Sequence, residues 1–249
     1  MIVGLGPGRL EYMTPRALKA VAAADYILGH SSYLEALESL LAGKNVISSS
    51  MGKEVDRAKQ AIDLARSHTV AIVSGGDAGV YGMASIVLEV LENSREKIDV
   101  EIIPGVTAAN AAASRAGSPL SGDFAVISLS DLLTPLDVIE KRLDAFFSAG
   151  IPVVLYNPKS RGRPHNFSIA VEHARKFLAG TTPVAIVRNA LRDDEETIVT
   201  TLGEIETSIE KIDMHTTVIF GGSESRIWRM GDDVKGIITP RGYHRKYVY

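Results

Sequence analysis

The chain has 249 residues, which is enough for one large domain or two modest ones. Its 45% hydrophobic and 23% charged residues are typical of a globular protein, and no apolar run approaches the roughly 20 residues that a membrane helix needs. The absence of cysteine excludes disulfides, thiolate nucleophiles and Cys-based metal sites, and the net charge of −3 argues against general nucleic-acid binding.

The first half of the chain alternates short apolar runs with helical periodicity. Strands are predicted at 2–5, 25–28, 46–47, 70–73 and 100–103, and helices at 15–24, 33–41, 55–68, 83–92 and after Thr107. Thr14 is expected to cap the helix that begins at Pro15. Because strands and helices take turns, the pattern favours a parallel sheet covered on both faces.

The stretch 115–122 is the expected domain junction, because it holds two glycines, a proline and two serines. The predicted domains are therefore 1–116 and 117–249. Beyond the junction, strands are predicted at 124–128, 153–156, 184–188, 196–201 and 217–220, and helices from Pro135, which Thr134 is expected to cap, and at 167–178.

The loop 75–82 is the most informative segment, since it places four glycines and Asp77 between a strand and a helix. Glycine permits a close approach of the backbone to a ligand, and the following helix begins with unpaired N–H groups. The negative charge of Asp77 disfavours a bare phosphate and favours a ligand with an ammonium or hydroxyl group. A tight turn without a ligand is the alternative.

The loop 4–8 has the spacing G-x-G-x-G. The dinucleotide-binding fingerprint needs a third glycine where this chain has Arg9, and Pro7 lacks an N–H that a pyrophosphate would use. Binding of a nicotinamide or flavin cofactor is therefore disfavoured.

All the loops of interest follow predicted strands, at 4–8, 75–82, 104–107, 156–158 and 188–190. Ligands of open α/β sheets bind at the carboxyl ends of strands. Because these loops come from both predicted domains, they suggest one cleft between the domains.

Four of these segments together resemble the tetrapyrrole methylase family, which uses S-adenosylmethionine: Val3–Gly8, Ser74–Gly82, Pro104–Thr107 and Leu155–Pro158. Within this family, 128–135 and 156–161 resemble the branch of cobalamin biosynthesis that methylates C-17 of a trimethylated tetrapyrrole and promotes ring contraction. Ala78 is similar to that branch, because many other relatives have proline there.

The resemblance implies a homodimer of two α/β/α domains, with the active site in the cleft between them. It also implies a set of residues that surround S-adenosylmethionine: Pro7, Gly76, Asp77, Val80, Tyr81, Thr107, Ala108, Asn157, Asn189 and Ala190. The implied partner is an anionic tetrapyrrole, with or without cobalt, and no nucleic acid or membrane is expected.

Methyl transfer from a sulfonium requires alignment of donor and acceptor and exclusion of water rather than a nucleophilic side chain. Ring contraction also needs proton transfer, for which Ser128, Ser130 and Asp131 are candidates, although Asp131 could serve only the start of the next helix. The histidines show no metal-binding spacing, so any cobalt is expected to arrive with the substrate.

Cationic side chains are expected to bind the substrate's carboxylates, and bidentate pairing with arginine is the strongest form. Two clusters of basic residues offer candidates, namely Arg161 and Arg163 in one and Arg241 and Arg245 in the other. The competing interpretation is that both clusters are solvated faces.

Three alternatives stay open: a methyltransferase of the same fold acting on another tetrapyrrole carbon, on diphthine or on an rRNA ribose; a non-catalytic tetrapyrrole-binding protein; and a nicotinamide enzyme. Because a strand is predicted from residue 2, no signal peptide is expected, and the lack of cysteine also points to the cytoplasm.

Overall fold

The computed structural model describes residues 1–248. The chain forms two compact units, Met1–Ala108 and Ala109–Tyr249, which divide at the start of helix α5 (Ala108–Arg115). The domain limits expected from composition, 1–116 and 117–249, stay a prediction.

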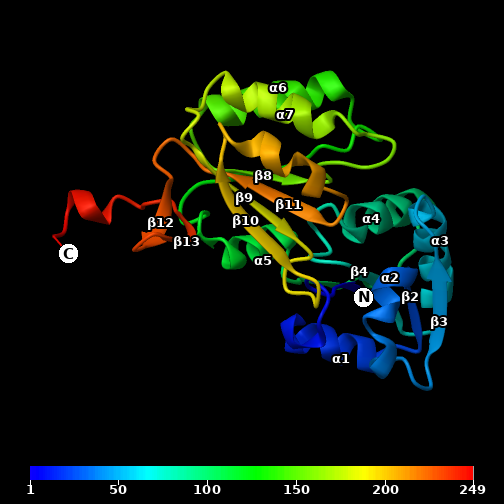
Figure 1. Ribbon diagram of the computed structural model, residues 1–249. Coiled ribbons are helices and arrows are strands. Elements are labelled where there is room, and N and C mark those ends of the chain that lie inside the picture. The colour runs from blue at the N-terminus through cyan, green and yellow to red at the C-terminus, as the bar shows by residue number, and fades with distance from the viewer. Residues whose placement is uncertain (249) are drawn as a thin grey trace. The chain divides into compact units, whose positions relative to one another are not determined.

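The first unit is a five-stranded sheet with helices on both faces (Figure 1). Its strands are β1 (Ile2–Gly4), β2 (Tyr26–His30), β3 (Asn45–Ser49), β4 (Val70–Ser74) and β5 (Ile102–Ile103). Its helical segments are η1 (Leu10–Tyr12), α1 (Pro15–Ala23), α2 (Ser31–Glu35), η2 (Glu38–Leu40), α3 (Glu54–Ala65) and α4 (Met83–Ser94). The strands pair in parallel in the order β3-β2-β4-β1-β5, which confirms the parallel sheet predicted for this half.

Both faces of this sheet are buried, as its apolar strands require. Val3 packs in the cluster formed with α1 and α2, whereas its neighbour Ile2 packs in the cluster formed with α3 and α4. The alternation follows from the period of two in a strand. At the start of α1, the Thr14 hydroxyl accepts a hydrogen bond from Ala17 N at 3.1 Å, so the predicted cap is confirmed.

The second unit holds a mixed five-stranded sheet in the order β10-β9-β11-β8-β7. The strands are β7 (Ala125–Ser128), β8 (Val153–Tyr156), β9 (Pro183–Arg188), β10 (Glu196–Thr201) and β11 (Thr216–Phe220). Strands β7 and β8 are parallel, and β11 is antiparallel to both β8 and β9. Consequently β7, β8 and β9 all end at one edge of the sheet, where β11 begins.

Helices α6 (Leu136–Ser148) and α7 (Asn166–Arg175), with η3 (Ile205–Lys211), cover one face of this sheet, and α5 covers the other (Figure 1). Phe147 and Phe167 pack their rings against Phe220 on the first face. Ala109 and other small residues of α5 pack on the second face, where a close approach of helix and sheet is needed. Each unit therefore has the α/β/α layering that the sequence predicted.

Two local features differ from expectation. Helix α6 starts at Leu136 with Pro135 in the cap position and no side-chain cap, so the prediction that Thr134 caps it is wrong. Thr134 lies one residue too early for the cap role. A three-stranded sheet of β12 (Arg226–Met230), β13 (Asp233–Ile238) and β6 (Gly117–Ser118) was not predicted, because charged side chains interrupt its strands. The last helical segment is η4 (Tyr243–Arg245).

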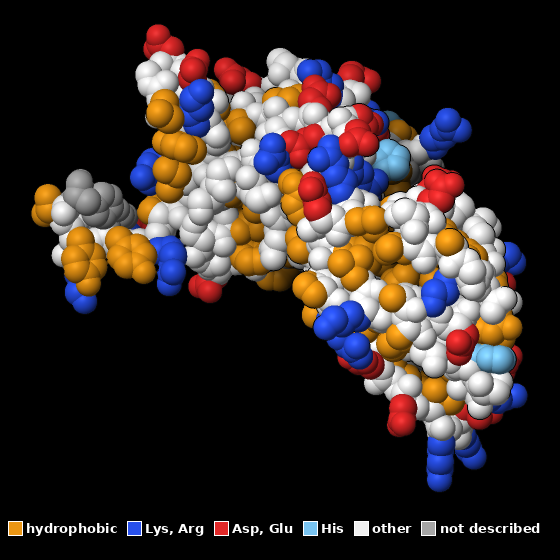
Figure 2. All heavy atoms as spheres, turned by 90° about the horizontal axis from the view of Figure 1, so that it is seen from below, with side chains coloured by type: hydrophobic (Ala, Val, Ile, Leu, Met, Phe, Trp, Pro, Cys, Tyr) orange, Lys and Arg blue, Asp and Glu red, His pale blue; other side chains and the backbone are white. Residues whose placement is uncertain are grey.

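The molecular surface has a mixed character on the side that Figure 2 shows, where positive, negative and apolar side chains are interspersed. None of the helices among residues 1–248 is long and apolar enough to cross a membrane.

Candidate functional site

The loops after β1, β4 and β5 pack backbone against backbone in the first unit. Gly6 and Gly76 exchange two hydrogen bonds, with N···O distances of 2.9 and 2.8 Å. A Cβ at Gly4 would lie 2.7 Å from Gly105 N, and a Cβ at Gly105 would lie 2.2 Å from Gly76 O. Only glycine permits these approaches, so the glycine pattern fixes the relative positions of the three loops.

Asp77 holds two of these loops together. Its Oδ1 accepts a hydrogen bond from Gly79 N at 2.8 Å, and its Oδ2 accepts one from Gly105 N at 3.0 Å. Each carboxylate oxygen has a further lone pair, so these bonds leave Asp77 able to face a ligand as well. The carboxylate is therefore a fixed charge within the loop cluster.

Part of the glycine loop is exposed to solvent. A Cβ at Gly76 would be in ordinary van der Waals contact with 106–108, at 3.8 Å. Val80 and Tyr81 are 37% and 61% exposed. Because β1 lies between β4 and β5, the first unit gathers seven predicted cofactor residues on neighbouring loops: Pro7, Gly76, Asp77, Val80, Tyr81, Thr107 and Ala108.

The sequence did not predict two aromatic contacts near the glycine loop. A Cβ at Gly75 would lie 2.6 Å from the ring of Tyr33, which follows β2, so this aromatic ring covers the loop. The imidazole of His30 lies edge-on to the Tyr33 ring, with 5.6 Å between the two ring centres. No short motif relates Tyr33 to Gly75, because these two residues lie far apart in the sequence.

Arg57 on α3 is buried and contacts groups from two other segments, the end of β3 and the start of α4. Its Nε donates to Ser49 Oγ at 2.7 Å and its Nη2 to Ser50 O at 3.2 Å, while its Nη1 contacts Met83 Sδ at 3.4 Å. Met83 is the first residue of α4, directly after the glycine loop. The guanidinium thus ties the end of β3 to the residue where that loop ends.

In the second unit, the ends of β7 and β8 are joined by side chains. Ser128 Oγ accepts hydrogen bonds from Asn157 Nδ2 at 2.9 Å and from Ser130 N at 3.2 Å. Asn157 has a φ of +52°, which non-glycine residues rarely adopt. The structure therefore brings together three of the predicted residues, Ser128, Ser130 and Asn157.

The loops after β7 and β8 also meet at a second point. Arg163 Nε lies 3.7 Å from Asp131 Oδ1, and among the described residues it is the one buried side-chain polar atom without a hydrogen-bond partner. Arg161 is exposed on the same loop. Beside Asp131, Leu132 and Leu133 are 76% and 90% exposed. This corner combines a partly buried cation with exposed apolar side chains.

The C-terminal arginines have local partners instead. Arg245 pairs with Glu224, and the Arg241 guanidinium lies 5.7 Å from the centre of the Tyr243 ring. Within the described part of the chain, neither arginine forms a hydrogen bond or ion pair with the loops at the ends of β7, β8 or β9. The structure does not bring this predicted pair together with Arg161 and Arg163.

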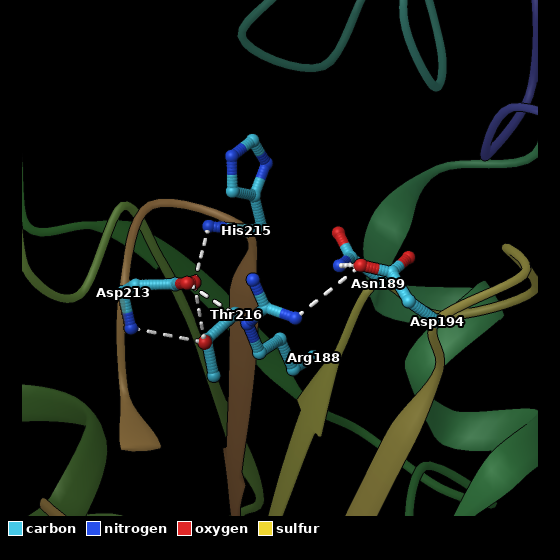
Figure 3. A network of polar contacts seen from close by, with 6 residues as sticks. All are labelled: Arg188, Asn189, Asp194, Asp213, His215 and Thr216. Atoms are coloured by element: carbon cyan, nitrogen blue, oxygen red, sulfur yellow. Dashed lines mark hydrogen bonds and ion pairs between the residues drawn. The ribbon is translucent and has the colours of Figure 1, made fainter. Parts of the chain in front are cut away.

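A polar network fixes the ends of β9 and β11 (Figure 3). Arg188 Nε donates to Asp213 Oδ2 at 2.8 Å, and Arg188 Nη1 lies 3.4 Å from Asp194 Oδ2. Asp213 Oδ1 accepts from His215 N at 2.8 Å and from Thr216 Oγ1 at 3.1 Å. The sequence did not predict this network, because Asp213 lies 25 residues from Arg188 and no short motif joins them.

The charges in this network support one another. The hydrogen bond to Asp213 raises the pKa of Arg188 above its ordinary value. Burial raises the pKa of Asp213, but the bonds from Arg188, His215 N and Thr216 outweigh it, so the pKa lies below its ordinary value. The carboxylate form of Asp213 is therefore stabilised.

Strained backbone marks the same edge of the sheets. Of the five non-glycine residues with positive φ in the described range 1–248, four lie in loops that follow β4, β8 or β9: Tyr81, Asn157, Asn189 and Leu191. Such conformations persist only where the surroundings impose them, and they concentrate at functional sites. The strand ends of each unit are thus a candidate functional region of that unit.

The layered α/β units and their strand-end loops define the class of protein. Residues 1–206 match the family described as Tetrapyrrole (Corrin/Porphyrin) Methylases. The match covers most of the 249 residues, and the chain belongs to this family.

Curated relatives are similar over nearly all of this chain. The "Cobalamin biosynthesis protein CbiHC" of Archaeoglobus fulgidus is 44% identical over 99% of the chain, which covers 53% of that protein. The "Cobalt-factor III methyltransferase" of Priestia megaterium is 42% identical over 100% of the chain, which covers 46% of it. The chain thus spans about half the length of these two relatives.

A third relative has a similar length. The "Probable cobalt-factor III C(17)-methyltransferase" of Salmonella typhimurium is 42% identical, and the match covers 97% of this chain and 98% of that protein. A further relative is the "Precorrin-3B C(17)-methyltransferase" of Sinorhizobium sp, which is 40% identical over 97% of this chain and 96% of that one. One of these two relatives is thus named for cobalt-factor III and the other for precorrin-3B.

Solved structures agree with the fold. The methyltransferase CobJ superposes with a TM-score of 0.87 and 33% identity, over 96% of this chain and 98% of that one. The uroporphyrin-III C-methyl transferase of Thermus thermophilus, complexed with S-adenyl homocysteine, gives a TM-score of 0.67 over 88% and 95% of the two chains. At 23% identity, the second likeness shows the fold alone.

Proposed function

We propose that this chain is an S-adenosylmethionine-dependent methyltransferase that methylates C-17 of a precorrin-3 type tetrapyrrole, with or without cobalt, and promotes ring contraction in cobalamin biosynthesis. The observation that carries the proposal is the cradle formed by the glycine loops after β1, β4 and β5, which fixes the Asp77 carboxylate on the same loop as the exposed Val80 and Tyr81. It occurs in a chain 42% identical, over nearly its whole length, to a relative named for this reaction.

The residues of the cradle fit a cofactor with cationic and apolar parts. Glycine backbone and the exposed Val80 and Tyr81 offer contact surface, and Asp77 offers a fixed negative charge toward a sulfonium or ammonium group. When bound, S-adenosylmethionine supplies an activated methyl group. The task of the chain is then to hold donor and acceptor in line and to exclude water. Asn157, Asn189 and Ala190 of the second unit are proposed to complete the cofactor site.

Substrate binding is assigned to the corner formed by the loops after β7 and β8. Arg163, partly buried with an unsatisfied Nε, is suited to bind a carboxylate of the macrocycle, and the exposed Arg161 can bind another. Ser128, Ser130 and Asp131 are the proposed groups that hold or move protons during ring contraction. Arg241 and Arg245 stay weaker candidates, because each already has a local partner.

We further propose a homodimer in the cytoplasm, with the active site between the two units. The family resemblance supports the dimer and the shared site, and the lack of cysteine supports the compartment. The net charge of −3 and the interspersed charges in Figure 2 argue against a nucleic acid as the partner.

The test is a methyl-transfer assay with S-adenosylmethionine that carries ¹³C in its methyl group, offered with cobalt-factor III and with precorrin-3B. We expect NMR of the product to locate the label at C-17 with one or both substrates. Label at another carbon would show that the enzyme methylates a different position of the tetrapyrrole. Tetrapyrrole binding without transfer would favour a non-catalytic binding protein.

A further inference from the structure

Asn189, directly after β9, has a backbone fixed on both sides. It is 7% exposed, and its φ is +49°. Its N–H donates to His215 O at 3.0 Å, and its carbonyl accepts from Arg192 N at 2.9 Å. The side chain therefore starts from a rigid position at the end of the strand.

Hydrogen bonding fixes the orientation of the Asn189 side-chain amide. Its Nδ2 donates to Asp194 Oδ2 at 2.7 Å. An ionised carboxylate only accepts hydrogen bonds, so the amide nitrogen must face Asp194 and the amide oxygen must face the other way. Figure 3 shows this oxygen pointing away from Asp194, past the end of β9.

The oxygen of this amide is an available acceptor. Within residues 1–248, Arg163 Nε is the one buried side-chain polar atom that lacks a partner, so the unbonded Asn189 Oδ1 is not enclosed by protein. An accessible acceptor on a residue that is otherwise buried faces whatever occupies the space beyond the strand end.

Asp194 is itself held in place. Arg188 Nη1 lies 3.4 Å from the same Oδ2 that binds Asn189, and Arg188 is anchored by Asp213 at 2.8 Å. Asp213 is bonded in turn to the backbone and hydroxyl at the start of β11. The orientation of the Asn189 amide is therefore set by a chain of contacts that begins in the neighbouring strand.

We propose that Asp194 is a positioning residue that aims Asn189 Oδ1, as a hydrogen-bond acceptor, at an N–H or O–H donor of the bound cofactor. This inference rests on the proposed function, in which Asn189 contacts S-adenosylmethionine. The cofactor has three kinds of donor: the adenine amino group, the ribose hydroxyls and the α-ammonium group.

The test is calorimetric titration of S-adenosylhomocysteine into the wild type, Asn189→Gly, Asp194→Ala and the double variant. Glycine is chosen because it adopts a φ of +49° without strain. Loss of one hydrogen bond predicts that Asn189→Gly and Asp194→Ala each raise the Kd about 3- to 10-fold. The double variant should bind no more weakly than Asn189→Gly, because Asp194 acts through Asn189.

The matched control is Glu196→Gln. It breaks the ion pair of Glu196 with Lys211 beside the network, at 3.0 Å, without touching Asn189, so its Kd should equal the wild-type value. Asp194→Asn supplies a rescue, since its amide oxygen can still accept from Asn189 Nδ2. It should bind more tightly than Asp194→Ala.

Three results would overturn the inference while the wild type still binds: an unchanged Kd in Asp194→Ala, additive losses in the double variant, or no rescue by Asp194→Asn. A wild type that fails to bind S-adenosylhomocysteine is a different outcome, because it overturns the proposed function together with this inference.

NMR of the unliganded protein provides a readout without cofactor. The side-chain NH₂ signal of Asn189, identified by its absence in Asn189→Gly, should shift in Asp194→Ala and also when S-adenosylhomocysteine is added to the wild type. If the chemical shift of this NH₂ signal is the same in Asp194→Ala as in the wild type, the positioning role is contradicted, even if that variant is unstable at higher temperature.

S-Inosylhomocysteine, which has a carbonyl in place of the adenine amino group, identifies the donor. If the amino group is the partner, Asn189→Gly should not weaken binding of this analogue further. An equal loss with both ligands assigns the ribose or the ammonium group, and no loss with either contradicts the inference.

Discussion

The strand ends of the two units are fixed by different physical means. In the first unit, glycines let three loops pack backbone on backbone, with Gly6 and Gly76 bonded at 2.8 and 2.9 Å. In the second unit, side chains join the loops, as in the Asn157–Ser128 bond at 2.9 Å and the Asn189–Asp194 bond at 2.7 Å. Backbone packing fixes the loops through glycine positions that have no room for a Cβ, whereas side-chain networks present directed donors and acceptors.

This difference suggests that the two units contribute to ligand binding in different ways. A cradle of backbone suits the part of a ligand that needs close approach, and the directed polar groups suit recognition and proton transfer. Substitutions in the first unit should therefore act by steric exclusion, and those in the second unit by loss of orientation. Four predictions test that contrast.

The largest effect is expected for Gly105→Ala, because its Cβ would lie 2.2 Å from a backbone oxygen that cannot move alone. Overpacking lowers the free energy of unfolding by about 1–3 kcal/mol, which predicts a lower Tm, and the displaced loops should raise the Kd for S-adenosylhomocysteine at least about tenfold. Gly122→Ala is the control, since a Cβ at Gly122 meets no atom within 4 Å. Equal behaviour of the two variants would refute the backbone-packing account.

Asp77→Ala should have the next largest effect. It removes the acceptor of two backbone N–H groups and a negative charge, so we expect a Kd for S-adenosylhomocysteine about tenfold higher. Asp77→Asn retains one acceptor oxygen and should lose less. Wild-type affinity in Asp77→Ala, measured by the same titration, would remove this residue from the site.

For the second unit, Arg163→Ala should raise the KM for the tetrapyrrole about tenfold and leave the cofactor Kd unchanged. Arg161→Ala should raise KM less, because Arg161 is exposed. Arg142→Ala, at an exposed position on α6, is the matched control. The measurement is steady-state kinetics. An unchanged KM in Arg163→Ala would favour the interpretation that Arg161 and Arg163 form a solvated surface without a role in substrate binding.

The smallest effect concerns pH. The pKa of Asp213 is lowered in the folded protein, so its contribution to stability is present above the ordinary carboxyl pKa of about 4 and is lost as pH falls through the folded pKa. Urea unfolding should show Asp213→Asn less stable than wild type at pH 7. The difference should shrink below about pH 4, and a difference independent of pH would contradict this assignment.

The sequence predicted the features that local patterns encode. Alternating apolar runs gave the parallel sheet of the first unit, Thr14 was visible as a cap, and the glycines of 75–82 marked the cradle. Thr134 failed as a cap because Pro135 delays the helix by one residue, and local chemistry does not resolve such a shift.

The features that the sequence did not predict depend on distant partners. Tyr33 contacts Gly75 because β2 and β4 are neighbours in the sheet, and Asp213 contacts Arg188 because β11 and β9 pair. Arg57 contacts Met83, which lies on another helix. A charged side chain on its own gives no signal of the partner that the fold supplies. For this reason the residues that orient the site are visible only in the folded chain.

The most direct test of the central claim is calorimetric titration of the wild-type protein with S-adenosylhomocysteine, alongside Gly105→Ala and Gly122→Ala. The account predicts saturable binding at a single site per chain, retained in Gly122→Ala and strongly weakened in Gly105→Ala. Absence of binding by the wild type would contradict the assignment of the strand-end loops as a cofactor site.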